Sequence, residues 1–493
     1  MKLCCSFSLV FSFFIIQANA QNYQTVNADR IAYFADTYKD VSALRIDSVL
    51  SQDGMHLFPF KTIEAMKGGG YCVSPYVSSW IGKEVIMLND GVNQFVNVDD
   101  EIISINTWAK LQDTWVAYVA STDSSKVMAT IASHDNLSFL GITDSVKTIT
   151  FQAYDKNDAP INSSVNYTSM QLSKNNGLVQ TLNFHYFPDF AAGYPFLGFS
   201  ELTLVGSNDI EQGVSNFTWF EANDFDVDDE LHVVEYEQSE NQSVEKNEIR
   251  TYLTRTDFAD SIIYQYAREV QTEIDSLLPD NSVSTTIKYL QDTVTETIKR
   301  NPDFNKLPKE TFYNGFAVNF YGMSFDESFV YKSIPKPNWE TYQLNSEDSC
   351  WETTLWDGCV EMGNYMKTLG GPYFVCDENF TDKWSRQLVF YKKDTTTWGD
   401  PLDLTAIHEN DANSIEFNLY PNPAADKIYW NINTNDLTNT FVAFYNVVGD
   451  LVKEIRVTNN MQTMDVSQLP KGIYVYKLKQ DQEVLKSGKL VIQ

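Results

Sequence analysis

The chain has 493 residues, a formal net charge of −30 at pH 7 and an aromatic content of 14%. That length is sufficient for roughly two to four domains with sizeable hydrophobic cores. The charge excludes a nucleic-acid-binding protein, which needs a basic surface, and argues against electrostatic attachment to anionic lipid.

The first 20 residues have the pattern of a secretory signal peptide. Lys2 supplies a positive start, an apolar stretch runs from Leu3 to Ile16, and Ala18 and Ala20 form the small-x-small pattern of a cleavage site. The apolar stretch is too short to span a membrane, and no later segment is apolar over a sufficient length. We therefore predict an exported mature chain that starts at Gln21 and has no transmembrane segment.

Residues 21–402 are predicted to be mainly β structure. Val, Ile, Thr, Tyr and Phe alternate with polar residues, and pairs such as Asp-Gly and Asn-Gly separate the alternating segments. The clearest strands are 83–88, 146–153, 178–184, 201–205, 262–266 and 386–391. The span 259–300 is also compatible with a helix, but the alternation of Ile262, Tyr264 and Tyr266 favours strands. We predict two antiparallel β-rich domains, residues 21–213 and 214–402, of the meander, sandwich or half-barrel type.

Four cysteines follow the signal peptide: Cys72, Cys350, Cys359 and Cys376. An even number in an exported chain predicts disulfides, and three pairings are possible. The short loop between Cys350 and Cys359 favours that pair. It leaves Cys72 with Cys376, a bond that would join the N-terminal region to the end of the second one. A metal site is the alternative, but the chain has no Cys-x-x-Cys spacing and no His near the cluster.

Two segments are candidates for binding. Trp351 and Trp356 lie in the loop between Cys350 and Cys359, and rigid aromatic side chains there suit a sugar or peptide platform; the alternative is that they cover a core. Asp224, Asp226 and Asp228 alternate in an acidic segment and could offer oxygen ligands to Ca²⁺, although the Gly and distal Glu of an EF-hand are missing. The alternative is a solvated strand, and we predict no other cofactor.

Motifs of known catalytic chemistry are missing. The chain contains no His-Glu-x-x-His, no Gly-x-Ser-x-Gly and no phosphate-binding Gly-rich loop. Its five histidines are His56, His134, His185, His232 and His408. Each is interpreted as structural, although a triad whose members are distant in sequence would escape this search.

A polar linker at 403–416 precedes a small antiparallel sandwich of Ig-like type at 417–493. Ile428, Trp430 and Ile432 alternate on one face, as in a half-buried strand. The order of certain residues is more specific than this pattern: Pro421, Asn422, Pro423, Gly449, Gly472, Tyr474 and Lys489. In this arrangement the segment resembles the C-terminal sorting domain of proteins exported by the type IX secretion system of Bacteroidota.

The resemblance implies that the type IX secretion machinery is a partner. It also implies that the sorting domain is recognised at the outer membrane and removed, and that the cargo is then released or attached to the cell surface. Upstream, Trp80-Ile-Gly82 and Leu369-Gly-Gly-Pro-Tyr373 resemble segments of other exported Bacteroidota proteins, which have no assigned activity.

Any molecular activity must therefore lie in residues 21–402. We predict a non-enzymatic binding module at the cell surface or outside the cell, with an unidentified extracellular ligand. The alternative is a secreted hydrolase of polysaccharide or protein. Converging carboxylates in a cleft, or a His beside a Ser or Cys, would favour the hydrolase. A flat surface with exposed Trp351 and Trp356 would favour binding.

Overall fold

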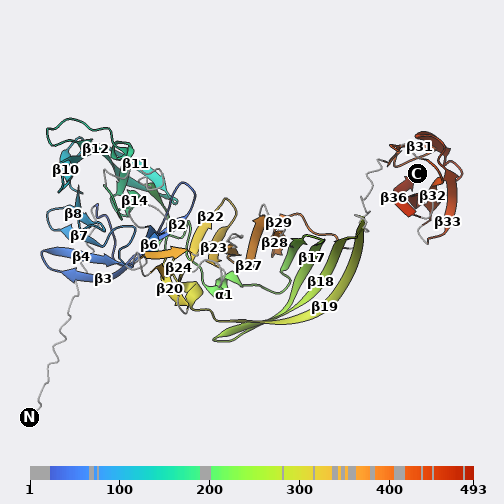
Figure 1. Cartoon of the computed structure of the whole chain (residues 1–493), viewed down its shortest axis with the longest axis horizontal. Helices are drawn as coiled ribbons and strands as arrows, with labels where there is room; N and C mark the ends of the chain where they lie inside the picture. Colours follow the sequence, from blue (N-terminus) through green and yellow to red (C-terminus); the bar gives the residue numbers. More distant parts are fainter. Residues whose placement is uncertain are drawn as a thin grey trace, which may run out of the picture. The chain divides into compact units, whose positions relative to one another are not determined.

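The computed structural model forms two compact units, residues 1–402 and 403–493 (Figure 1). It describes residues 23–65, 72–74, 77–188, 201–279, 282–314, 317–335, 342–345, 350–353, 362–377, 383–404, 417–434, 437–446, 449–480 and 483–493. The predicted signal peptide lies outside these residues. The predicted fold class is confirmed, because regular structure is nearly all antiparallel β. Within the described ranges, no helix has the length and apolar character to cross a membrane.

The first sheets of the larger unit form a sandwich. One is eight-stranded, in the order β10-β11-β12-β13-β14-β15-β1-β2. Its strands are β1 (Ala32–Ala35), β2 (Val41–Leu44), β10 (Thr114–Val119), β11 (Lys126–Phe139), β12 (Ile142–Tyr154), β13 (Ser169–Ser173), β14 (Gly177–Leu182) and β15 (Glu201–Ser207). The other is five-stranded, in the order β3-β4-β7-β8-β9. Its strands are β3 (Ile46–Ser51), β4 (Gly54–Pro59), β7 (Glu84–Leu88), β8 (Val92–Val96) and β9 (Ile102–Asn106).

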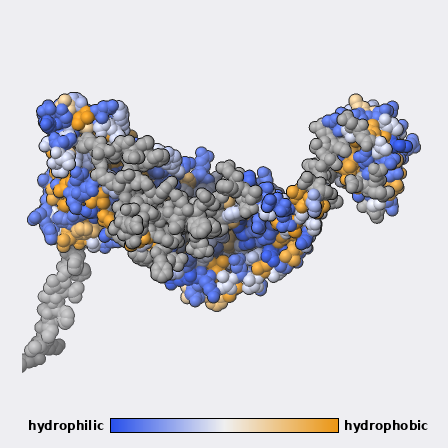
Figure 2. All heavy atoms as spheres, in the orientation of Figure 1, coloured by the Kyte–Doolittle hydropathy of each residue, from blue (hydrophilic) through white to orange (hydrophobic). Residues whose placement is uncertain are grey.

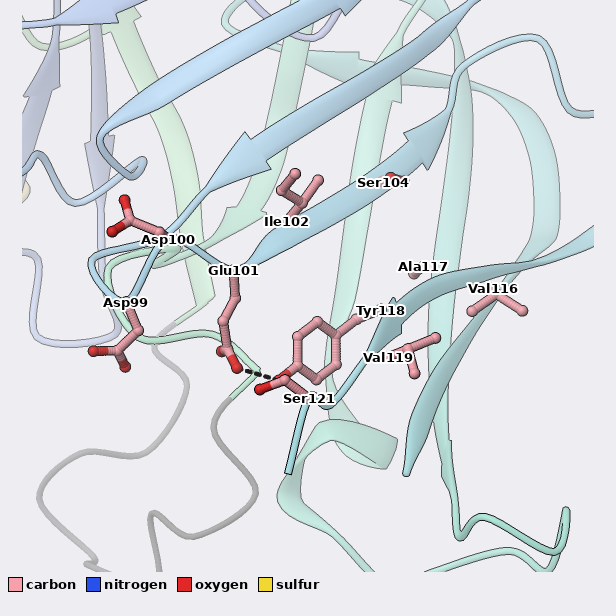
Figure 3. A pocket seen from close by; sticks show the side chains of 10 residues that line it. All are labelled: Asp99, Asp100, Glu101, Ile102, Ser104, Val116, Ala117, Tyr118, Val119 and Ser121. Atoms are coloured by element: carbon pink, nitrogen blue, oxygen red, sulfur yellow. Dashed lines mark hydrogen bonds between the residues drawn. The ribbon is translucent and has the colours of Figure 1, made fainter. Parts of the chain in front are cut away.

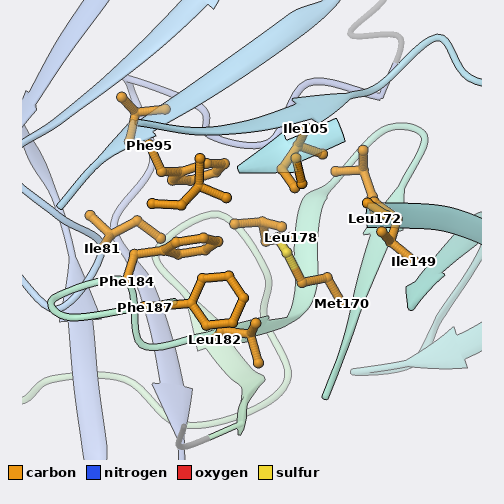
Figure 4. Close-up of a cluster of buried hydrophobic side chains, with 14 of the residues drawn as sticks. Ile81, Phe95, Ile105, Ile149, Met170, Leu172, Leu178, Leu182, Phe184 and Phe187 are labelled. Carbon is orange, nitrogen blue, oxygen red and sulfur yellow. The ribbon is translucent and has the colours of Figure 1, made fainter. Parts of the chain in front are cut away.

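A single hydrophobic core fills the space between these two sheets (Figure 4). Strand alternation supplies it: every second residue of β7 and β8 is buried, and Phe95 has no exposed surface. The ring of Phe95 stacks on Phe184 at 4.2 Å between centroids. Phe184 follows β14, which ends at Leu182, two residues before the predicted end. The chain turns at 184–188, where Asn183 Oδ1 accepts a hydrogen bond from the backbone N–H of His185.

The first described residues are anchored to this sandwich. The N–H of Tyr23 donates to the carbonyl of Lys174 at 3.0 Å, and its hydroxyl lies 2.7 Å from His134 Nε2. The ammonium of Lys147 lies 4.1 Å from the centre of the Tyr23 ring. Tyr23 is consequently only 9% exposed. Thus the start of the described chain is part of the core rather than a free end.

Two further sheets complete the larger unit. One is six-stranded, in the order β20-β21-β24-β25-β6-β5. The other is ten-stranded, in the order β19-β18-β17-β16-β28-β27-β26-β23-β22, with β29 paired to β28. The strands of the first are β5 (Glu64–Ala65), β6 (Cys72–Ser74), β20 (Thr311–Asn314), β21 (Ala317–Phe320), β24 (Tyr342–Asn345) and β25 (Cys350–Thr353). Those of the second are β16 (Glu230–Ser239), β17 (Gln242–Asp257), β18 (Ser261–Leu277), β19 (Val283–Lys299), β22 (Gly322–Phe325), β23 (Val330–Pro335), β26 (Met362–Met366), β27 (Gly370–Asp377), β28 (Lys383–Lys393) and β29 (Thr396–Gly399).

The six-stranded sheet contains strands from both sides of the predicted boundary at Gly213, because β6 pairs with β25. Bridges between Asp40 and Ser324 and between Thr62 and Glu310 also cross this position. The described residues up to Leu402 accordingly cluster as one compact unit. Separate domains at 21–213 and 214–402 stay a prediction. The short helices are η1 (Ser164–Tyr167), α1 (Trp219–Ala222) and η2 (Asp303–Asn305).

The span 259–300 forms strands, as its alternation predicted, and not a helix. It makes β18 and β19, which lie beside β17 as long, curved neighbours (Figure 1). Near the base of these strands, Tyr252, Ile262 and Tyr264 are buried against Phe225. Packing therefore fixes the end of this hairpin that holds Tyr252 and Ile262, whereas residues 283–293 of β19 have no buried face.

The smaller unit is a two-layer sandwich, as predicted. Its strands are β30 (Phe417–Tyr420), β31 (Lys427–Ile432) and β34 (Met461–Asp465) in one sheet, and β32 (Thr440–Tyr445), β33 (Leu451–Arg456), β35 (Gly472–Gln480) and β36 (Glu483–Ile492) in the other. Ile428, Trp430 and Ile432 of β31 are at most 1% exposed, while the residues between them face solvent. Phe444 and Leu478 of the second sheet meet them in the core.

Candidate functional site

The Pro421-Asn422-Pro423 segment ties the start of the smaller unit to its last strand. Asn422 Nδ2 donates to the carbonyl of Lys489 at 2.6 Å, and Asn422 Oδ1 accepts from the N–H of Val491 at 2.9 Å. An Asn side chain is suited to this because it carries both a donor and an acceptor. Neither Pro421 nor Pro423 has an N–H, so the segment cannot extend a strand ladder here.

The remaining residues of the predicted motif occupy turns and the core. Gly449 has a φ of +90°, in the region that favours glycine, and its N–H donates to the Asn446 carbonyl. Gly472 begins β35. Tyr474 is 5% exposed and donates its hydroxyl to the Pro470 carbonyl at 2.7 Å. The motif residues thus specify how this sandwich closes.

The predicted cysteine and tryptophan residues are only partly described. Cys376 is disulfide-bonded and buried on β27. Cys72 and Cys350 begin the paired strands β6 and β25, but their side chains lie outside the described residues, as does Cys359. The pairing therefore stays a prediction. Trp351 on β25 is half-buried and lies opposite Leu344 of β24. Trp356 is not described, so the aromatic platform also stays a prediction.

The acidic segment 224–230 is folded around two basic side chains. Arg255 Nη1 donates to Asp224 at 2.7 Å and to Asp226 at 3.3 Å. Lys393 donates to the Asp224 carbonyl at 2.9 Å and forms an ion pair with Asp229. Hydrogen bonds to the carboxylates of Asp257 and Asp224 raise the pKa of Arg255, so the guanidinium stays charged. Over the described part of the chain, no group of three His, Cys, Asp or Glu is arranged to hold a metal ion.

Asp228, the third predicted calcium ligand, takes part in the turn of the same segment. It has a φ of +71°, and its N–H donates to the Tyr252 carbonyl at 2.9 Å. In this geometry Arg255 provides the positive charge that a calcium ion would bring to Asp224 and Asp226. Calcium binding at these residues stays a prediction.

The four described histidines each contact a polar group on another part of the fold. His56 lies 2.5 Å from Glu84, and His134 contacts Tyr23 and Ser145. His232 accepts a hydrogen bond at Nδ1 from the Leu402 N–H, so its Nε2 carries the proton that faces Glu230. Burial lowers the pKa of His232, which favours this neutral form. His408 lies outside the described residues.

His185 lies beside Ser78, which is the juxtaposition that would favour a hydrolase. The Ser78 Oγ and His185 Nδ1 atoms are 2.5 Å apart. However, the two residues are only 2% and 3% exposed, and Ser78 Oγ also lies 3.2 Å from the Ser79 carbonyl. A serine nucleophile must be open to the carbonyl that it attacks. The pair therefore has the geometry of a buried link between 78–79 and the turn at 184–188.

A buried lysine joins three segments of the larger unit. Lys332 on β23 has no exposed surface, and its Nζ donates to Asn216 Oδ1 and to the Lys306 carbonyl, each at 2.7 Å. The same Nζ lies 4.8 Å from the ring centre of Phe304 and 5.3 Å from that of Tyr321. Burial lowers the pKa of Lys332 to about 7. Sequence inspection missed this residue, because a lysine in a strand is usually at the surface.

A pocket of about 520 Å³ lies between β9 and β10 (Figure 3). β9 is the edge of the five-stranded sheet and β10 the edge of the eight-stranded one, and they lie side by side. The indole Nε1 of Trp115 on β10 donates to the Ser104 carbonyl on β9 at 2.8 Å. No ladder joins β9 to β10 in the described structure, so backbone groups of both edges border the pocket.

Carboxylates line one side of this pocket. Asn97 Oδ1 accepts from the N–H groups of Asp99 and Glu101, both at 2.9 Å, and so fixes the turn that presents these acids. Glu101 accepts from the Tyr118 hydroxyl at 2.6 Å (Figure 3). It also accepts from Asn97 Nδ2 at 3.2 Å. Asp100 forms an ion pair with Lys83 at 2.7 Å. The site therefore carries a net negative charge in a fixed arrangement.

Apolar side chains line the other side. Ile102, Val116 and Val119 are 46%, 44% and 55% exposed (Figure 3). A pocket with an acidic side, an apolar side and two strand edges suits an extended ligand that is cationic and partly apolar. Sequence inspection missed this pocket. The run of three acids from Asp99 to Glu101 was the available signal, but it does not show that β10 lies beside it.

Comparisons with known proteins identify a family for one part of the chain. The family described as "Secretion system C-terminal sorting domain" matches residues 418–493. No curated protein matches the chain. One solved structure, of PorZ, an essential bacterial surface component of the type-IX secretion system of Porphyromonas gingivalis, aligns with 95% of this chain and 81% of its own, at 8% identity. Its TM-score is 0.14, so the alignment carries no structural argument.

The prediction for the C-terminal segment is confirmed by this family match and by the sandwich that its residues form. The sorting domain also accounts for the partner expected from the sequence, the type IX secretion machinery. Residues 418–493 are a type IX C-terminal sorting domain, and the protein is exported, to be secreted or attached to the surface of the outer membrane.

Proposed function

We propose that this exported protein is a non-enzymatic binding module that captures extended, cationic segments of other proteins. The observation that carries the proposal is the pocket between β9 and β10, where two strand edges that pair with no further strand among the described residues meet three carboxylates and three exposed apolar side chains. An extended peptide can pair its backbone with such an edge, while alternate side chains enter the pocket. A Lys or Arg would face Glu101, and a neighbouring apolar residue would face Ile102 and Val116.

An array of short peptides tests this proposal. Residues 21–493 should be retained by peptides that carry Lys or Arg beside Val, Ile or Leu, and rising salt should weaken retention because part of the attraction is electrostatic. Ile102→Lys places a cation in the pocket and should weaken binding about tenfold, the equivalent of about 1.4 kcal/mol.

Leu253→Lys is the matched control, because Leu253 is a similarly exposed apolar residue, at 43%, on the interior strand β17. Retention by the control should equal that of the wild type. The proposal fails if no peptide is retained, or if Ile102→Lys and Leu253→Lys behave alike.

The hydrolase alternative has one observation in its favour, the contact between Ser78 and His185. Fluorogenic esters and peptides give a direct test. We expect no turnover by the wild type, because neither residue is open to a substrate. Turnover that disappears in Ser78→Ala would establish the hydrolase and overturn the structural role.

A further inference from the structure

The edge strand β19 has the features of a strand that can pair with a further strand. Its 17 residues pair with β18 without a register shift, from Val283 opposite Leu277 to Lys299 opposite Ser261. Among described residues, β19 pairs with no other strand. Its outer edge therefore presents a row of backbone N–H and C=O groups over the length of the strand.

Exposure on both faces distinguishes β19 from an ordinary edge. From Ser284 to Thr293, every residue except Ile287 is exposed, and the large side chains of Tyr289 and Leu290 are 60% and 48% exposed. The strand contains neither Pro nor a bulge, two of the devices that block edge pairing, and its charged residues include both signs. Figure 2 shows the visible surface of this sheet as a mixture of hydrophilic and hydrophobic residues, not a continuous apolar patch. Such a surface suits strand pairing with a defined register.

We propose that β19 pairs in antiparallel fashion with β19 of a second copy of this chain, about a two-fold axis at Leu290. This register places Lys288 of each copy opposite Asp292 of the other, so two opposite-charge pairs flank the axis. An axis at Lys288 or at Asp292 places like charges opposite each other, and an axis at Tyr289 or Gln291 forms no ion pair. Directly opposite charges stabilise a strand pair and like charges destabilise it, so the charges select the axis at Leu290.

The register also gives a substantial contact. Residues 283–297 of the two copies overlap, which provides about 15 backbone hydrogen bonds at one per paired residue. At the axis, the two Leu290 side chains face each other on one side of the sheet. Arg268 already donates to Asp292 at 2.9 and 2.7 Å, so this carboxylate is held in place before Lys288 of the second copy approaches.

Cysteine substitution tests the register. Directly opposite Cα atoms in an antiparallel pair are about 4.5–5.5 Å apart, within the range of a disulfide. Leu290→Cys in residues 21–493 should therefore form an intermolecular disulfide at micromolar concentration, seen on a non-reducing gel. Tyr289→Cys is the control, because Tyr289 lies opposite Gln291 and the two Tyr289 Cα atoms are separated beyond that range. Equal cross-linking of both variants, or none with Leu290→Cys, overturns the register.

Sedimentation velocity tests the dimer without a new cysteine. The wild type should be a dimer, and Lys288→Glu should raise the dimer dissociation constant about tenfold or more, because two attractive pairs become repulsive. Lys299→Glu makes the same charge change on the same strand, outside the overlap, and should leave the constant unchanged. A monomeric wild type, or an equal effect of the two variants, overturns the proposal.

Discussion

Replacing Lys332 by methionine should remove a pH dependence from the stability of the larger unit. Lys332 is fully buried, and its pKa falls from 10.5 in the unfolded chain to about 7 in the folded one. Between these values the unfolded chain binds a proton that the folded chain does not. Stability is therefore lost as the pH falls from 10.5 towards 7, at about 1.4 kcal/mol per pH unit, or about 5 kcal/mol in total. Below pH 7 both states are protonated and the loss levels off.

Urea unfolding followed by tryptophan fluorescence measures this effect, because Trp219 contacts Phe304 beside the lysine. The free energy of unfolding of Lys332→Met minus that of the wild type should increase by about 1.4 kcal/mol for each unit by which the pH is lowered from 9.5 to 7.5. Comparing the two proteins at each pH cancels the titration of groups they share. Lys110→Met, at an exposed lysine, provides the control. If the difference in free energy of unfolding between Lys332→Met and wild type does not change with pH, then burial does not lower the pKa of Lys332.

Three further predictions concern other sites. Arg255→Gln should destabilise the larger unit by only about 0.5–1 kcal/mol, because the carboxylates of Asp224, Asp226 and Asp257 that it pairs with are exposed to solvent; it should also create a Ca²⁺-dependent rise in Tm, and a similar rise in the wild type would instead support the calcium hypothesis. Trp430→Ala should destabilise the sorting domain by about 3–5 kcal/mol and trap the chain in the periplasm; normal secretion, measured by immunoblot of the medium and cell fractions, would contradict this. Peptide mapping without reduction should find Cys376 joined to Cys72, whereas a link from Cys376 to Cys350 would disprove the predicted pairing.

The strands were predictable because their signal is local. The alternation of Ile262, Tyr264 and Tyr266 placed a strand in a segment whose composition also allowed a helix, and the buried pattern of β31 follows directly from its sequence. The sorting domain was recognisable because its motif residues occur in a fixed order. The contact that explains Asn422 was not predictable, since Lys489 lies 67 residues further along the chain.

The pocket and the buried lysine could not be predicted because they depend on which segments meet. Ile102 and Val116 belong to different sheets, and nothing in either strand indicates that two edges lie together. The sequence around Lys332 alternates like an ordinary strand. Its burial results from aromatic residues at Phe304 and Tyr321, which reach it from other parts of the chain.

The anchoring of Tyr23, together with the predicted signal peptide, leads us to expect an order of events during export. The predicted signal-peptide cleavage follows Ala20, three residues before a side chain that is held by His134 and Lys147 in the sandwich. A protease needs several residues of accessible, extended chain around the bond that it cuts. Once the sandwich has closed over Tyr23, the chain is held in place from the third residue after the predicted cut. Signal-peptide removal should therefore precede folding of the N-terminal sheets, so a chain that folds first would keep its leader and remain tethered to the inner membrane.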